Sequence, residues 1–140
     1  MSNRTILATL ALGAAIAFAG PAVAEKMKAT LDGKSEVPAN TSAGTGTADI
    51  DYDAASKKLS WKVTYSGLSG PATAAHFHGP AEAGKNAGVA VPIANIASSP
   101  AEGSATLTDA QAADLAAGKY YVNIHTAANP GGEIRGQVTK

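Results

Sequence analysis

The chain has 140 residues, no cysteine, and equal numbers of basic and acidic side chains, 11 of each, so it carries no formal net charge at pH 7. The basic residues are scattered, without a cationic stripe or an aromatic platform, and this pattern gives no support for nucleic-acid binding. The lack of cysteine excludes thiolate metal sites, disulfide redox chemistry and a cysteine nucleophile. Any transition-metal site must therefore use nitrogen and oxygen ligands, with methionine as the one sulfur alternative.

The first 24 residues have the organisation of a secretory signal peptide. Arg4 supplies a positive start, residues 6–18 are mostly apolar, and Ala22-Val23-Ala24 is a small-x-small cleavage site. We expect cleavage before Glu25, which leaves residues 25–140 as a single exported domain, periplasmic or secreted, with no membrane attachment. The alternative is a retained membrane anchor, but the apolar run is too short and too rich in small residues for a convincing span.

Alternation of apolar and polar residues predicts β-strands along most of the remaining chain. Strands are expected, in chain order, over residues 26–31, 47–53, 59–65, a segment carrying His76 and His78, 89–93, 104–107, 120–126 and 134–138. The second and third of these form the clearest hairpin. A glycine-rich loop over 79–88 follows the histidine strand, and Pro92 indicates a sheet edge or a bulge in the next one.

One helix is expected, over about Asp109 to Ala117. Thr108 and Gln111 have the spacing of a capping box, and Gly118 is the stop signal. Seven or eight short strands with one helix predict an all-β fold, an antiparallel sandwich or barrel. We see no internal repeat and no second domain in the sequence.

All three histidines of the chain lie in two short motifs, Ala75-His76-Phe77-His78-Gly79 and Val122-Asn123-Ile124-His125-Thr126. Side chains two residues apart on a strand point to the same face, so His76 and His78 share one face and Phe77 takes the other. His125 shares a face with Asn123 and Tyr121. If the two strands are neighbours, the three imidazoles converge, and the pattern predicts a metal site at His76, His78 and His125.

Most of the chain after the signal peptide resembles the CHRD domain, a module first noted in chordin and common in exported bacterial proteins. The blocks that carry the resemblance are Glu36-Val37-Pro38, Gly44-Thr45-Gly46-Thr47-Ala48, Tyr65-Ser66-Gly67-Leu68, Ala74-Ala75-His76-Phe77-His78-Gly79-Pro80-Ala81, Tyr121-Val122-Asn123-Ile124-His125-Thr126 and Asn129-Pro130-Gly131-Gly132-Glu133-Ile134-Arg135-Gly136-Gln137. The last three blocks are long and specific.

The resemblance implies an immunoglobulin-like, Greek-key β-barrel of the kind found in copper–zinc superoxide dismutases. In those enzymes two histidines at i and i+2 and another from a late strand bind copper, and His76, His78 and His125 are similar to these. The chain lacks the further histidine that bridges copper and zinc, the zinc-binding cluster, the cysteine pair and a clear counterpart of the guiding arginine. The resemblance therefore implies one mononuclear copper-type site and no dismutase activity.

Three neutral imidazoles suit copper best among the common divalent metals, and zinc is the second candidate. Met27 would favour Cu⁺, but nothing in the sequence places it near the histidines. Asn123, Thr126 and Glu133 are candidates to hold the imidazoles by their other nitrogen. Glu133 and Arg135 alternate on one strand and are expected to pair with each other or with a neighbour.

Other interpretations of these residues stay open. The histidines can form a packed polar network without a metal, and Asp49, Asp51 and Asp53 suggest calcium but have the pattern of a solvated strand face. The first functional hypothesis is a periplasmic copper-binding protein for buffering, transfer or resistance, with a periplasmic protein as a further partner. The second is a non-catalytic interaction or adhesion module. An enzyme is the third, but the sequence shows no acid–base pair and no substrate pocket.

Overall fold

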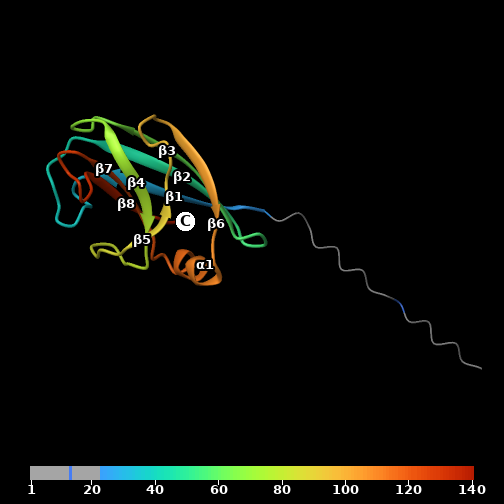
Figure 1. Cartoon of the computed structure of the whole chain (residues 1–140). Helices are drawn as coiled ribbons and strands as arrows, with labels where there is room; N and C mark the ends of the chain where they lie inside the picture. The colour runs from blue at the N-terminus through green and yellow to red at the C-terminus, as the bar shows by residue number, and fades with distance from the viewer. Residues whose placement is uncertain (1–12, 14–22) are drawn as a thin grey trace, which may run out of the picture.

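A computed structural model describes residue 13 and residues 23–140 of the chain (Figure 1). The predicted signal peptide and its cleavage site therefore lie mostly outside the described residues. Eight strands and one helix follow in chain order: β1 (Glu25–Asp32), β2 (Thr45–Asp53), β3 (Lys58–Ser66), β4 (Ala72–His78), β5 (Val89–Pro92), β6 (Ala101–Thr106), α1 (Asp109–Ala116), β7 (Tyr121–Thr126) and β8 (Ile134–Gln137).

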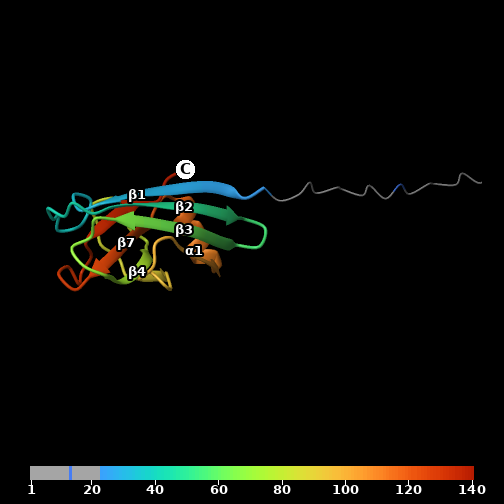
Figure 2. The same ribbon diagram turned by 90° about the horizontal axis from the view of Figure 1, so that it is seen from above.

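All eight strands belong to one antiparallel sheet in the order β5-β4-β7-β8-β1-β2-β3-β6. The sheet curls until β3 and β4, which are not hydrogen-bonded neighbours, face each other across the core. The ring centroids of Trp61 on β3 and Phe77 on β4 lie 5.2 Å apart. Figure 2 shows β1, β2 and β3 side by side in one layer of the barrel, and β4 and β7 in the opposite layer. The molecule is thus a nearly closed all-β barrel, and the predicted fold class is confirmed.

The period-two alternation of the sequence decides which side chains fill the core. Leu31, Val63 and Phe77 have exposed fractions of 0%, and that of Ile50 is 2%. Burial of each such side chain stabilises the fold by about 1.5–3 kcal/mol before entropy is counted. The intervening residues of β1, β2 and β3 face outward and are mainly lysine, threonine and aspartate.

The helix α1 begins at the predicted capping box. Thr108 Oγ1 accepts a hydrogen bond from Gln111 N at 3.2 Å, and Gln111 Oε1 accepts one from Thr108 N at 2.9 Å. Leu115 is buried, and Gln111 Nε2 donates to the Ala90 carbonyl of β5 at 3.0 Å, so the helix is fastened beside an edge strand. In the described part of the chain, no helix is both long enough and apolar enough to cross a membrane.

Candidate metal centre

The three histidines come together because β4 and β7 are neighbours in the sheet. His76 lies directly opposite Asn123, two residues before His125 on β7. Phe77 is fully buried in the core, so His76 and His78 on either side of it point to the opposite face. On that face, one nitrogen from each of the three imidazoles lies within 4.8 Å of the others. The structure therefore brings together all three predicted residues in an arrangement that can hold a metal ion.

Two backbone carbonyl groups determine which imidazole nitrogens are free. His78 Nδ1 lies 3.0 Å from the Ala87 oxygen, and His125 Nδ1 lies 2.8 Å from the Pro130 oxygen. A carbonyl oxygen only accepts, so Nδ1 of both rings donates and Nε2 carries the lone pair. Nε2 of His78 is buried without a hydrogen-bond partner among the described residues. An outer hydrogen bond that fixes the ring and leaves one lone pair free is typical of metal-binding histidines.

The third histidine is hydrogen-bonded to another member of the group. His76 Nδ1 lies 3.1 Å from His125 Nε2, and because His125 Nε2 is an acceptor, His76 Nδ1 is the donor. A cation that uses His76 Nδ1 needs this proton to move to Nε2 of the same ring. A neutral imidazole carries one proton in either tautomer, so the charge of the site does not change.

Both β4 histidines favour the neutral form that binds metals. Burial lowers the pKa of His76, and the neighbouring charges of His125 and His78 lower it further. Burial also lowers the pKa of His78, although its hydrogen bond to the Ala87 carbonyl has the opposite effect. Protons therefore compete little with a cation for these rings at neutral pH.

The glycine-rich loop between β4 and β5 is tied to His78 through Tyr121. The Tyr121 ring stacks on the His78 ring, with 4.9 Å between centroids and 5° between planes. The Tyr121 hydroxyl accepts from Ala87 N at 3.1 Å and donates to Ala87 O at 3.2 Å. The same carbonyl oxygen accepts from His78. Tyr121 therefore fixes both the plane of the imidazole and the position of its hydrogen-bond partner.

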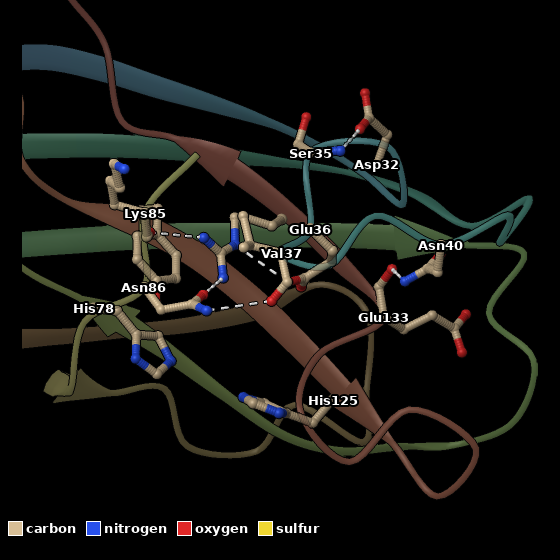
Figure 3. Close-up of polar contacts among 12 residues, drawn as sticks. Asp32, Ser35, Glu36, Val37, Asn40, His78, Lys85, Asn86, His125 and Glu133 are labelled. Atoms are coloured by element: carbon tan, nitrogen blue, oxygen red, sulfur yellow. Dashed lines mark hydrogen bonds and ion pairs between the residues drawn. The ribbon is translucent and has the colours of Figure 1, made fainter. Parts of the chain in front are cut away.

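A buried ion pair that the sequence analysis did not identify supports this loop. Arg135 Nε donates to Glu36 Oε2 at 3.2 Å, and the two side chains are 5% and 3% exposed. The guanidinium carbon of Arg135 lies 3.9 Å from the centroid of the Tyr121 ring, a cation–π geometry. The guanidinium also donates to Lys85 O at 3.0 Å and to Asn86 Oδ1. Figure 3 shows this network beside the histidine rings.

One sequence signal pointed to this pair. Arg135 interrupts a short strand between Ile134 and Gly136, and a charged residue in such a place needs a partner when it is buried. From the sequence, the expected partner of Arg135 is Glu133 or a neighbour. The partner is Glu36, 99 residues earlier in a loop between β1 and β2. Pairing over that separation depends on the fold.

Glu133, one of the residues expected to hold the imidazoles, has a different role. Its carboxylate accepts hydrogen bonds from four side chains, Ser42, Ser69, Thr126 and Asn129. In Figure 3 it points away from His125 and His78. Thr126 is one of its donors, so two of the three expected supports stabilise a separate cluster. Backbone carbonyl groups hold the imidazoles of His78 and His125 instead.

The strand face considered for calcium is balanced by lysines. Lys26 Nζ lies 2.8 Å from Asp51 Oδ1, and Asp49 lies opposite Lys62 in the ladder. Met27 is 6% exposed in the core. Within the part of the chain that the structure describes, the three histidines are the one close group of three or more side chains that could hold a metal.

Comparison with known proteins identifies the family. The family model described as the CHRD domain matches residues 27–138, a span that runs from β1 to β8 and includes all three histidines. The chain therefore belongs to the CHRD family, as its sequence blocks indicate. Neither the curated proteins nor the solved structures give a significant match.

Proposed function

We propose that this member of the CHRD family is an exported copper-binding protein that holds one copper ion through His76, His78 and His125. Buffering, transfer or detoxification of copper in the periplasm would be its role. The observation that carries the proposal is the convergence of three imidazole nitrogens within 4.8 Å. Carbonyl groups fix two of these rings with Nε2 free.

Copper is favoured over zinc by the chemistry of the donors. Neutral imidazole binds both metals, and copper stands above zinc in the affinity order of divalent ions. Metal–nitrogen distances are about 2 Å. To bind one ion, the three imidazole nitrogens would have to move closer to one another by about an ångström. Rotation of the half-buried rings of His76 and His125 can provide this movement. The proposed export rests on the signal-like first 24 residues.

Titration of the metal-free protein with Cu²⁺ tests the proposal. We expect one tight equivalent in the parent and its loss in both His78→Ala and His125→Ala. Thr73→Ala is the matched control, because Thr73 is an exposed residue on the same strand as His78. Its copper affinity should equal that of the parent.

Metal analysis of protein isolated from its native compartment then identifies the metal. We expect copper in about equal proportion to protein. Zinc in its place would overturn the choice of metal. Parent-like binding in both histidine variants would overturn the site, and would leave the interaction or adhesion hypothesis as the better explanation of the fold.

A further inference from the structure

Asn123 occupies the centre of the histidine face. In the ladder it lies opposite His76 on β4 and opposite Arg135 on β8. It also precedes His125 by two residues on β7, so the two side chains share a face. Its side chain therefore lies on the same face of the sheet as the imidazoles, and the residue is 2% exposed.

The two ends of the Asn123 amide have different surroundings. A Cβ atom added at Gly132 would lie 2.7 Å from Asn123 Nδ2 and 2.4 Å from Glu36 Oε1, so the nitrogen end faces Gly132 and Glu36. The oxygen end points elsewhere. His78 lies opposite Tyr121 and His76 lies opposite Asn123, so Asn123 and His78 are diagonal neighbours on one face of the sheet, where their side chains can approach each other.

Two buried acceptors on this face of the sheet lack hydrogen-bond partners. Asn123 Oδ1 and His78 Nε2 are both buried, and neither has a hydrogen-bond partner among the described residues. His78 donates through Nδ1 to Ala87, so its Nε2 carries only a lone pair. A buried acceptor without a partner costs about 1–3 kcal/mol. A cation, or water bound to a cation, satisfies both.

We infer that Asn123 Oδ1 is a fourth donor of the histidine centre and binds a divalent metal ion, directly or through one water molecule. This inference rests on the proposed function and specifies it further. Cu²⁺ and Zn²⁺ accept neutral oxygen ligands beside imidazole, whereas Cu⁺ prefers softer donors. Asn123 therefore adds affinity for divalent ions and little for Cu⁺, so it biases the centre toward the oxidised metal.

Replacement of the amide by an apolar side chain of similar size isolates this contribution. In Asn123→Leu we expect the affinities for Cu²⁺ and for Zn²⁺ to fall by about 10–100-fold. The affinity for Cu⁺, measured in the same variant under reducing conditions, should change by less than about threefold. The g values of the Cu²⁺ electron paramagnetic resonance spectrum should shift, while the nitrogen couplings of the imidazoles persist.

A second variant keeps the test independent of the stability of Asn123→Leu. Asn123→Asp preserves the shape and replaces the amide with a carboxylate, so we expect tighter binding of Cu²⁺ and Zn²⁺ than in the parent. Thr126→Val is the matched control: Thr126 is a buried polar residue on the same strand whose hydroxyl donates to Glu133 at 2.8 Å. Loss of this hydroxyl group should lower the melting temperature of the protein and leave its metal affinity unchanged.

The outcomes separate this inference from the proposed function. If Asn123→Leu weakens Cu⁺ as much as Cu²⁺, or if neither Asn123 variant changes Cu²⁺ affinity, Asn123 is not a donor and the histidine site still stands. If the parent binds neither oxidation state in a histidine-dependent way, the proposed function fails first, and the assignment of Asn123 fails with it.

Discussion

Two buried glutamates, Glu133 and Glu36, differ in how the protein compensates their negative charge. Glu133 is 0% exposed, and its two oxygens accept hydrogen bonds from Ser42, Ser69, Thr126 and Asn129. Burial opposes its ionisation, but these hydrogen bonds outweigh burial and lower the pKa of Glu133 to about 2. Glu36 is 4% exposed, and its Oε1 has no partner among the described residues. Burial raises the pKa of Glu36 despite the nearby Arg135.

The difference separates a carboxylate whose two oxygens are both hydrogen-bonded from one that keeps an oxygen without a partner. The hydrogen bonds to Glu133 connect the loops before β2, β4 and β8. Their donors are protein side chains. Glu36 Oε1 has no partner among the described residues and lies, like Asn123 Nδ2, close to Gly132. Buried polar atoms without a hydrogen-bond partner are uncommon in native proteins.

The largest expected effect is the loss of the Glu133 charge. In Glu133→Gln the amide cannot accept from all of the present donors, and buried hydroxyl groups lose their partners. A pKa that falls from 4.5 to about 2 corresponds to about 3 kcal/mol of folding free energy. We expect a loss of this size in urea unfolding at pH 7. Glu102→Gln, at an exposed position on β6, is the control and should change stability by less than about 0.5 kcal/mol.

An unchanged unfolding free energy in Glu133→Gln would show that the hydrogen bonds to Glu133 are no stronger than those to a neutral amide. The cluster would then be a packing feature, and the contrast with Glu36 would lose its electrostatic basis.

The unfolding free energy at acidic pH should also depend on the ionisation of Glu133. Because the folded-state pKa of Glu133 is lowered, its stabilisation is present above about pH 4.5 and is lost as the pH falls toward 2. The pH dependence that Glu36 contributes has the opposite sign. Its pKa is raised, so its contribution to stability is largest in acid and declines as the pH rises through the folded-state pKa.

We expect the parent to lose stability between pH 4.5 and 2, and Glu133→Gln to lose clearly less. Unfolding free energies measured at several pH values in one salt concentration test this, and parallel curves for the two proteins would contradict it.

The fold could be predicted in large part because alternation is a local signal. Each strand from β1 to β8 is marked by residues that are neighbours in sequence, and the helix by its Thr108 capping box. The order of the strands in the sheet is not local. The pairing of β4 with β7, on which the histidine site depends, entered the sequence analysis only as a condition.

The candidate site was predictable to the same extent. Strand parity placed His76 and His78 on one face and Phe77 on the other, and the structure agrees. The carbonyl groups that hold the imidazoles were not predictable, because a backbone oxygen has no residue-type signature. The Glu36–Arg135 pair was missed for the related reason that its members lie 99 residues apart and in different kinds of segment.

The smallest expected effect belongs to Glu36→Gln. Removal of one partner of a buried ion pair commonly costs about 3–5 kcal/mol, because the other charge is left without compensation. Here Arg135 keeps acceptors on Lys85 and Asn86 and the face of the Tyr121 ring. The variant also removes a carboxylate whose ionisation burial already opposes. These effects offset one another, so we expect a change of less than about 1 kcal/mol in the unfolding free energy of the metal-free protein at pH 7. Glu82→Gln, in the exposed part of the neighbouring loop, is the control. A loss of 3 kcal/mol or more in Glu36→Gln would mean that the ion pair is a structural element like the Glu133 cluster.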